Sequence, residues 1–416
     1  MMTTLLPLDG PQLCRDARRR TGLGDFGRPQ LEPALSTLLE SLNREPDLHP
    51  LGRLLMRIHL RGLLETRLRL VEAWKKADLA VRPNGPGAPG RPGQSNSSNP
   101  IKRPIFIVGI PRSGSTYLHE LLAQNPGYRA PRVWEVMFPV RNQDNDTNDA
   151  QRRVRQAAFC LWCFRLLAPQ ADAVYPMRAT TPHECVAIHS YTFLSQEFVS
   201  TCRIPSYERF LRHADLTPAY EWEKRFLQYL QSEGGSQRWV LKSPDHVFGL
   251  EQLLKVFPDA TIIQTHRNPL EVLRSATALT RVLHGLYARP GDLAEILSHE
   301  AAVCADGAEL FMRFRDDHPE LSDRIIDVRY PDLIGDPVGT VRTILERAHS
   351  PMTPQISQRV HQLAANRSRY RGVRPADQPC GLALDRSLDL RFKGYCSRFG
   401  LPFHEPSLTS KHLTIS

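Results

Sequence analysis

Residues 105–122 read IFIVGIPRSGSTYLHELL, and this stretch decides the fold. It opens with a short continuous apolar run, which is typical of a buried parallel strand, and passes through a loop into a helical pattern. Gly109 and Gly114 have the spacing of a phosphate-binding loop, but Ser115 stands where nucleoside triphosphatases carry a lysine, and a positive charge occurs earlier, at Arg112. The strand–loop–helix order predicts that N–H groups at the helix start bind an anion.

Strands and helices alternate along the chain beyond this stretch. We predict further strands at 238–243, 260–267 and 324–330. Helical patterns separate and follow them at 244–257, 269–284, 293–317 and 337–348. The alternation predicts an α/β fold, a P-loop-like three-layer sandwich with a central parallel sheet covered by helices on both faces. Ligands of such sheets bind beyond the carboxyl ends of the strands.

Composition divides the chain into three parts. Residues 1–81 carry helical periodicity over much of their length, so we predict a helical N-terminal region that packs on the core. Residues 82–103 are rich in Pro, Gly, Ser and Asn and should form a linker or loop. Residues 104–416 form the predicted α/β domain, and a mainly helical insertion at 140–235 separates its first two strands.

The overall positive charge favours anionic ligands but does not indicate which one. The chain has 54 basic and 44 acidic residues, a net charge of +10, and the charges are spread along its length. A solvated basic surface is the simpler explanation of this balance. Basic residues do not cluster with aromatics, so we expect no nucleic-acid partner. With no apolar run long enough for a membrane span and no secretory signal, we expect a cytoplasmic protein.

Eight cysteines without regular spacing argue against a disulfide framework. Cys160 and Cys163 form one C-x-x-C pair within AFCLWCFRLL, a segment that is apolar all round. A zinc site of this type needs a second pair of ligands with matching spacing. We therefore predict two buried cysteines on a core helix.

A second anion site is predicted in THRNPLEVLRS. Arg267 ends a predicted strand, Asn268 and Pro269 have the character of a helix cap and a first helical residue, and Ser275 lies two turns into that helix. The neighbouring strand ends are also basic, at Lys242 and His266–Arg267. A Walker-type site would need an acidic strand end and a loop lysine for its metal-bound triphosphate. A P-loop kinase or NTPase is therefore the alternative function, not the first one.

Three stretches together resemble one enzyme family. PIFIVGIPRSGSTYLHELLAQNP, RWVLKSPDHVFGLEQLLKVFPDATIIQTHRNPLEVLRS and DVRYPDLIGDPVGTVRTIL are similar to the sulfotransferases that use 3′-phosphoadenosine 5′-phosphosulfate (PAPS), and most similar to a bacterial branch with chains of comparable length. The N-terminal residues also resemble that branch, so the likeness covers nearly the whole chain. It implies sulfuryl transfer, without a metal, to a hydroxyl or amine of a small-molecule, lipid or glycan acceptor.

The resemblance also implies binding residues for the nucleotide. The loop residues expected to hold the 5′-phosphosulfate are Arg112, Ser113, Gly114, Ser115 and Thr116. Arg267 and Ser275 are expected to hold the 3′-phosphate. Arg112 is predicted as the main cation for the transferred group, and Lys242, at the end of a neighbouring strand, as the second.

The resemblance also implies a general base, since in polysaccharide-modifying sulfotransferases a catalytic glutamate follows the same loop and helix at a similar distance. Glu135 stands at that distance, in an apolar context that would raise its pKa, and is the predicted base. His246, in LKSPDH, is the rival, although the histidine of related small-molecule enzymes lies closer to the lysine. His183 and Glu184 are expected to line the acceptor pocket.

A third hypothesis for the function is a non-catalytic relative that binds nucleotide but has lost its chemistry. The sequence leaves open the acceptor, the oligomeric state and the role of the basic segment 365–375, which could close over the nucleotide or remain a solvated loop.

Overall fold

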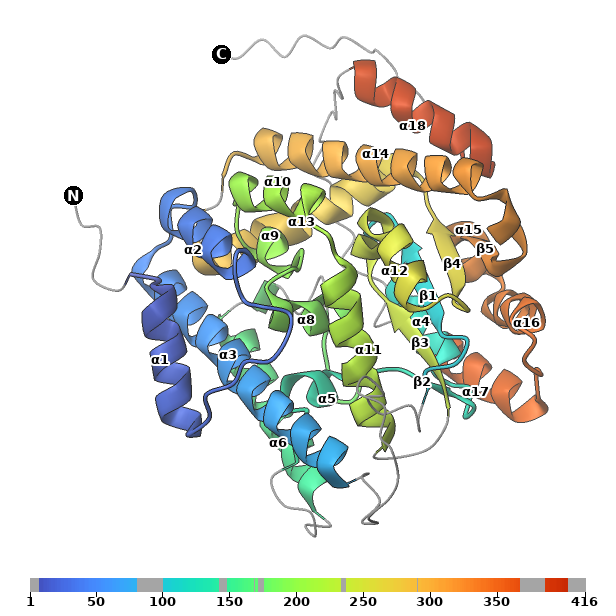
Figure 1. Cartoon of the computed structure of the whole chain (residues 1–416). Coiled ribbons are helices and arrows are strands. Elements are labelled where there is room, and N and C mark those ends of the chain that lie inside the picture. The colour runs from blue at the N-terminus through green and yellow to red at the C-terminus, as the bar shows by residue number, and fades with distance from the viewer. Residues whose placement is uncertain are drawn as a thin grey trace, which may run out of the picture.

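The computed structural model describes residues 7–80, 100–141, 148–167, 169–170, 176–232, 237–289, 291–366 and 386–402. Its centre is a five-stranded sheet with the order β2-β3-β1-β4-β5, in which every pairing is parallel (Figure 1). The strands are β1 (Ile105–Gly109), β2 (Tyr128–Arg129), β3 (Arg238–Lys242), β4 (Thr261–His266) and β5 (Ile325–Arg329). The predicted α/β fold with a parallel sheet is confirmed.

The opening stretch forms the middle of the sheet because β1 is buried along its whole length. Ile105 and Ile107 point into the layer of α4 (Ser115–Leu122), α15 (Tyr330–Gly335), α16 (Pro337–Arg347) and α17 (Pro354–Ala365). Phe106 and Val108 point into the opposite core, which includes α11 (Thr217–Ser232) and α12 (Leu250–Val256). An apolar run without alternation therefore supplies both faces of a three-layer sandwich.

Two details of the predicted elements are wrong. The helix expected at 244–257 is divided into η2 (Pro244–Phe248) and α12, because Gly249 adopts a non-helical backbone between them. The short strand β2 pairs with β3 through Tyr128 and Arg129. It has no signal in the sequence, because two residues are too few to show a period.

The N-terminal part contains α1 (Gly10–Thr21), α2 (Ala34–Arg44) and α3 (Pro50–Ala80). Arg67 of α3 is completely buried and donates hydrogen bonds to the carbonyl oxygens of Phe26 and Tyr191, both at 2.7 Å. Its guanidinium lies over the ring of Trp222, 4.6 Å from the centroid. Carbonyl oxygens thus replace the water that this cation loses, and the N-terminal helices are held against the insertion. The predicted division into domains stays a prediction, and residues 82–99 of the linker lie outside the described residues.

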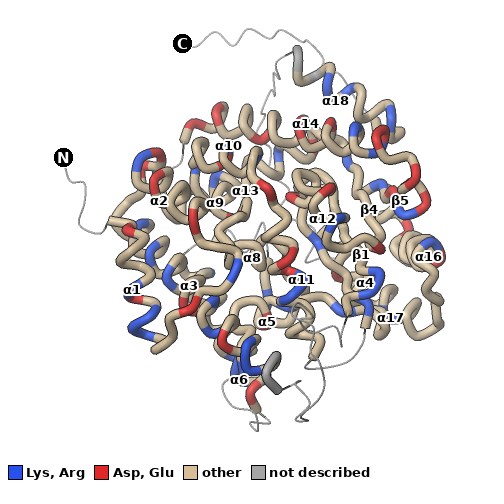
Figure 2. Tube along the Cα trace, in the orientation of Figure 1, with Lys and Arg blue, Asp and Glu red and all other residues tan. Residues whose placement is uncertain are grey.

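The described part of the insertion is helical. It contains α6 (Asp149–Leu167), α8 (Cys185–His189), η1 (Ser190–Thr192), α9 (Glu197–Thr201), α10 (Pro205–His213) and α11, and α5 (Val133–Met137) precedes it. On the other side of the sheet from α16, α13 (Pro269–Tyr287) and α14 (Leu293–Asp317) pack together, and α18 (Arg386–Phe399) lies on α14 (Figure 1). Figure 2 shows basic and acidic residues interspersed along most of these helices.

The prediction of a buried helix around Cys160 and Cys163 is wrong. α6 packs on α5 with one face, through Ala157 and Leu161. Its opposite face leaves Phe159 62% and Trp162 51% exposed, and both cysteines are only half-buried. Apolar residues all around a helix do not ensure burial when the neighbouring elements cover only part of its surface.

Candidate active site

The phosphate-type loop is wrapped tightly between β4 and the residue after β5. Gly109 and Gly114 have positive φ angles of 140° and 95°. A Cβ atom at Gly109 would lie 2.5 Å from the Thr265 carbonyl oxygen, and one at Gly114 would lie 2.7 Å from the Tyr330 ring. Both positions therefore require glycine for backbone conformation and for space. Arg112, between them, also has a positive φ of 62°.

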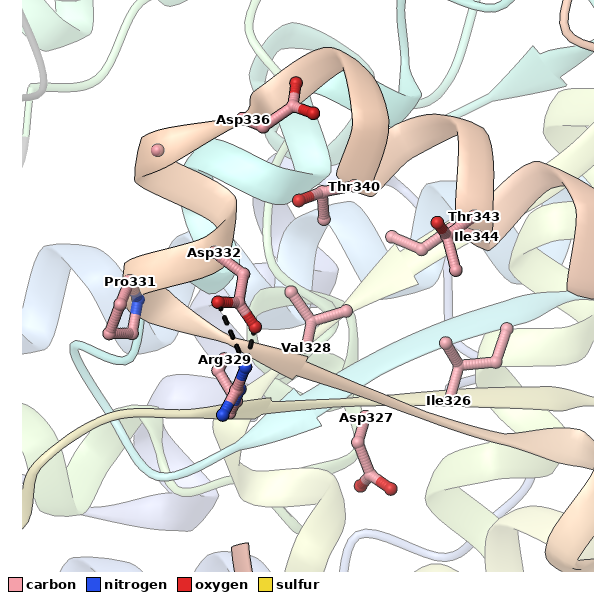
Figure 3. A pocket seen from close by; sticks show the side chains of 11 residues that line it. Ile326, Asp327, Val328, Arg329, Pro331, Asp332, Asp336, Thr340, Thr343 and Ile344 are labelled. Carbon is pink, nitrogen blue, oxygen red and sulfur yellow. Dashed lines mark hydrogen bonds and ion pairs between the residues drawn. The ribbon is translucent and has the colours of Figure 1, made fainter. Parts of the chain in front are cut away.

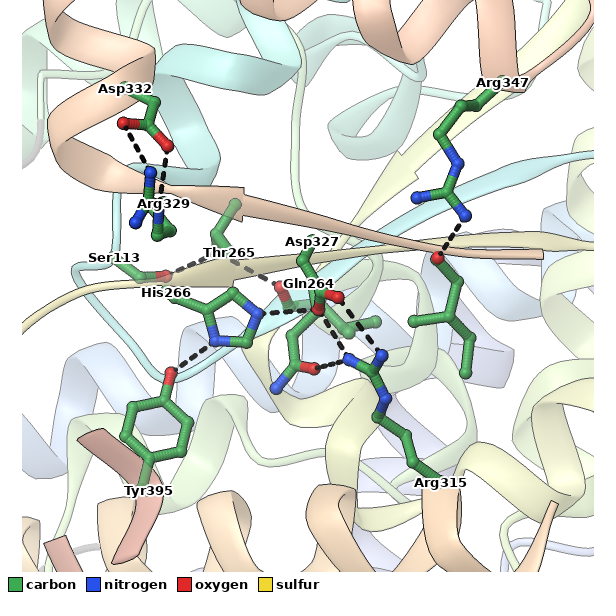
Figure 4. A network of polar contacts seen from close by, with 12 residues as sticks. Ser113, Gln264, Thr265, His266, Arg315, Asp327, Arg329, Asp332, Arg347 and Tyr395 are labelled. Carbon is green, nitrogen blue, oxygen red and sulfur yellow. Dashed lines mark hydrogen bonds and ion pairs between the residues drawn. The ribbon is translucent and has the colours of Figure 1, made fainter. Parts of the chain in front are cut away.

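Ser113 fastens this loop to the sheet. Its hydroxyl donates to the Ile110 carbonyl oxygen at 2.6 Å and lies 2.6 Å from the hydroxyl of Thr265 (Figure 4). The residue is completely buried. The side chain therefore shapes the loop, and the group that Ser113 can offer to an anion is its backbone N–H.

Lys242 brings a buried cation to the start of α4. The residue ends β3, is 1% exposed, and its Nζ donates to the Thr116 hydroxyl at 3.1 Å. The same Nζ forms an ion pair with Glu184, the residue before α8. His119 of α4 is also buried near this ammonium group. Burial lowers the pKa of His119 to about 3, and the positive charge of Lys242 is the second cause. An anion at the start of α4 would thus meet a preorganised ammonium group.

The two predicted anion loops meet through Arg112. Its Nε donates to the Ser275 hydroxyl at 2.9 Å, and Arg267 Nη1 donates to the Arg112 carbonyl oxygen at 3.1 Å. The Arg267 guanidinium lies 4.0 Å from the Tyr330 ring centroid and pairs with Glu271 at 2.9 Å. The structure therefore brings Arg112, Arg267 and Ser275 together, although the sequence predicts separate anchors for the two ends of a nucleotide.

The carboxylate of Glu135 accepts hydrogen bonds from residues just before it in the sequence. One carboxylate oxygen accepts from Arg129 Nη2 and the other from the Arg132 backbone N–H, both at 2.8 Å. These contacts close the first turn of α5, and the residue is 6% exposed. This carboxylate has two donors that hold it in place and stabilise its charge.

These features place the chain among known proteins. A model of the sulfotransferase family (Sulfotransfer_3) matches residues 104–354, which include both predicted anion loops and Lys242. The chain belongs to the sulfotransferase family.

Similar proteins are known from mycobacteria. The protein "Omega-hydroxy-beta-dihydromenaquinone-9 sulfotransferase Stf3" of Mycobacterium tuberculosis and of Mycobacterium bovis is 26% identical over 267 residues, which is 58% of this chain and 62% of the length of each relative. The crystal structure of sulfotransferase STF1 from M. tuberculosis superposes with a TM-score of 0.74 at 27% identity, covering 88% of this chain and 99% of that one. The structure of STF9 from Mycobacterium avium shares the fold, with a TM-score of 0.76 at 24% identity over 97% of this chain and 99% of that one.

The histidines predicted near the site have lowered pKa values. His246 is 1% exposed, its Nδ1 lies 3.0 Å from the Tyr220 hydroxyl, and burial lowers its pKa to about 3. Burial also lowers the pKa of His183. The prediction that His266 adds a cation to the site is wrong, because its ring nitrogens contact Tyr395 and Asp327, both at 2.9 Å, and burial lowers its pKa (Figure 4).

Two site residues were missed at the sequence level. Burial, and secondly the nearby charge of Glu184, raise the pKa of Asp245 to about 6, and the Ser243 hydroxyl donates to its carboxylate at 3.1 Å. Tyr330 contacts both the loop glycine Gly114 and Arg267. A positional rule could have found them, since Asp245 lies just beyond the predicted strand 238–243 and Tyr330 is the last residue of the predicted strand 324–330.

A separate hollow of about 460 Å³ lies at the edge strand β5 (Figure 3). It is lined by residues of β5, α15 and α16, among them Val328, Asp332, Thr340 and Ile344. Its lining includes no residue of the nucleotide loop. In the part of the chain that the structure describes, no helix is both long and apolar enough to cross a bilayer.

Proposed function

We propose that this protein transfers a sulfuryl group from PAPS to a hydroxyl group of an acceptor. The observation that carries the proposal is the convergence of Arg112, Arg267 and Ser275 beside the loop at the start of α4. A nucleoside triphosphate has phosphate at one end only, whereas PAPS carries a 3′-phosphate that the second loop can bind. Membership of the sulfotransferase family supports the same reading.

The loop before α4, the loop after β4 and Lys242 at the end of β3 have separate roles in this proposal. The 3′-phosphate is bound by Arg267 and Ser275, with Arg112 bridging to the loop through its bond to Ser275. The 5′-phosphosulfate is bound by the backbone N–H groups of Ser113, Gly114 and Ser115 and by the hydroxyl of Thr116. Arg112 was predicted from sequence as the main cation for the moving group, but the position of Lys242 beside Thr116 supports Lys242 in that role.

The base is proposed to be Glu184. In the absence of donor it pairs with Lys242, and the sulfonate oxygens of PAPS would compete for that ammonium group and release the carboxylate beside the reacting sulfur. The acceptor O–H proton then passes to Glu184 as the acceptor oxygen bonds to sulfur. The bond between sulfur and the bridging oxygen breaks, and adenosine 3′,5′-bisphosphate leaves with that oxygen.

The other predicted bases have less support. Glu135 has both oxygens engaged by Arg129 and Arg132, so we assign it the positioning of α5. His246 binds a proton weakly, since burial lowers its pKa to about 3. His183 stands next to Glu184 and remains a candidate for the acceptor pocket.

The acceptor is proposed to be an apolar, lipid-like alcohol. Two observations support this class over a glycan: the name of the Stf3 relatives, whose stated acceptor is a hydroxylated dihydromenaquinone, and the exposed apolar face of α6, which packs on α5 beside the site. A screen of lipid alcohols, phenols and oligosaccharides with PAPS would show a mass gain of one sulfo group. Sulfation confined to oligosaccharides would overturn the class and leave the reaction standing.

The donor is tested by calorimetry with adenosine 3′,5′-bisphosphate. Arg267→Ala should weaken binding about 10- to 100-fold, because it removes a charge-assisted contact to phosphate worth about 1.5–3 kcal/mol. Arg209→Ala, at an exposed arginine of α10, is the matched control and should bind normally. Turnover of magnesium-ATP would favour the kinase or NTPase alternative. Nucleotide binding without transfer to any acceptor would favour the non-catalytic one.

A further inference from the structure

Three buried side chains of metal-binding type meet behind the proposed active site. Cys185 begins α8, Glu223 lies in α11, and His246 lies in η2. All three are completely or almost completely buried. One sulfur, oxygen or nitrogen atom from each lies within 4.8 Å of the other two. Three elements that are far apart in the sequence therefore direct ligand atoms toward one point.

Two of these atoms are not satisfied by the protein. Glu223 Oε1 and His246 Nε2 are buried and have no nitrogen or oxygen hydrogen-bond partner within the described part of the chain, and the group that interacts with the Glu223 carboxylate inside the cluster is the Cys185 thiol. A buried polar atom without a partner costs about 1–3 kcal/mol, and more when it carries charge. Two such atoms aimed at a shared point indicate that a bound species belongs between them.

The surrounding contacts orient both groups as ligands. The Tyr220 hydroxyl holds His246 Nδ1 at 3.0 Å, which leaves Nε2 as the nitrogen that faces the cluster. His189, one turn after Cys185 on α8, binds the other carboxylate oxygen of Glu223 at 2.8 Å. Fixing the far nitrogen of a histidine and the far oxygen of a carboxylate is the usual outer-shell support of a metal site.

The chemistry of the donors selects the ion. A thiolate, a carboxylate and a neutral imidazole carry two negative charges, which a divalent cation neutralises in a site without solvent. Sulfur and nitrogen donors favour zinc over magnesium or calcium. Ligand atoms around tetrahedral zinc lie about 3.5 Å apart, so the observed spacing requires only a small inward movement of side chains, and the fourth position is left for water.

We propose that Cys185, Glu223 and His246 bind one zinc ion that ties α8, α11 and η2 together. The ion has a structural role. Glu184 immediately precedes Cys185, and Lys242 precedes the turn that carries His246, so the ion would fix the positions of both groups without touching the transferred sulfuryl. The proposal stands whether or not the protein transfers sulfuryl groups.

The first test measures metal in the full-length chain. Protein produced with added zinc and desalted to remove unbound metal should contain about one zinc per chain, as measured by inductively coupled plasma mass spectrometry. Replacing zinc by cobalt should produce the absorption of a thiolate–cobalt bond. Less than about a tenth of an equivalent of zinc after reconstitution, together with no cobalt absorption, would overturn the proposal and leave an enclosed water or a shared proton as the occupant.

Variants identify the ligands. Cys185→Ser should abolish the thiolate–cobalt absorption and lower zinc affinity at least about tenfold. Cys304→Ser, at another buried cysteine on α14, is the matched control and should keep full metal content. If Cys185→Ser does not fold, Glu223→Gln provides the same readout, because it keeps the size of the side chain and removes one ligand charge. Zinc retained at full stoichiometry and affinity in either variant, once it is shown to be folded, would contradict the assignment.

Discussion

Glu135 and Glu184 lie at the starts of two short helices that are brought side by side, since Arg132 and Pro182 form a bridge between their segments. They differ in their partners. Glu135 binds Arg129 and the backbone of its own helix, whereas Glu184 reaches another element and pairs with Lys242. The comparison shows that two glutamates in similar positions can have different partners, and we propose contact with the buried cation Lys242 as the criterion for the base.

The largest expected effect tests Glu184. Glu184→Gln should lower kcat about 10²- to 10⁴-fold with PAPS and an identified acceptor, because the amide cannot accept the acceptor proton. Binding of adenosine 3′,5′-bisphosphate should remain intact, as calorimetry would show. If this variant keeps full kcat, Glu184 is not the base, and contact with Lys242 does not identify the base.

Removing the partner of Glu184 should have the next largest effect. Lys242→Met keeps much of the side-chain length and should lower kcat about 10²- to 10³-fold, the usual result of losing one preorganised group that stabilises transition-state charge. Lys255→Met, at an exposed lysine of α12, is the matched control in the same steady-state assay. A loss confined to KM would mean that Lys242 binds PAPS and its transition state equally.

Glu135→Gln should affect stability more than turnover. Removing the charge weakens the contacts to Arg129 and Arg132 and should lower the unfolding free energy in urea by about 1–3 kcal/mol. We expect kcat of the folded variant to stay within about tenfold of the wild type, a smaller loss than proton transfer contributes. A loss of kcat as large as that of Glu184→Gln, without a stability change, would restore Glu135 as the base.

The smallest effect concerns His119, whose Nε2 lies 3.0 Å from the Val240 carbonyl oxygen below Lys242. Burial lowers its pKa to about 3 from an ordinary 6.5, so the folded state favours neutral imidazole. The stability that neutral His119 gives to the folded state is fully present above pH 6.5 and is lost as the pH falls toward 3. Between pH 6.5 and 5 this one group should remove about 2 kcal/mol from the unfolding free energy.

The matched variant for that prediction is His119→Gln, which retains a donor for Val240. Its unfolding free energy should fall less steeply with decreasing pH than that of the wild type, and the difference isolates His119 from the other buried histidines. Identical slopes would mean that His119 is protonated without penalty, and that the surroundings of Lys242 are more open to water than the buried contacts indicate.

The strands and the nucleotide loops could be predicted because their signals are local. A continuous apolar run marks β1, and short apolar clusters that alternate with helical patterns mark β3, β4 and β5. Glycines, a capping Asn268 and strand-end cations mark the loops that follow them. The exposed face of α6 could not be predicted, because burial depends on which surface is available to it. His266 is likewise a strand-end residue whose neighbours, Tyr395 and Asp327, come from distant segments.

Residues 105–122 by themselves predicted a buried strand, a glycine turn and a helix start, since these are set by the backbone preferences of adjacent residues. The alternation of strands and helices along the rest of the sequence predicted the parallel sheet. Tertiary structure alone decided which side chains face that loop. Lys242, Glu184 and Ser275 come from three segments, and so do Cys185, Glu223 and His246. Contacts between segments depend on packing, which no short stretch of sequence records, and packing separates the carboxylate that holds a helix from the carboxylate that meets the cation.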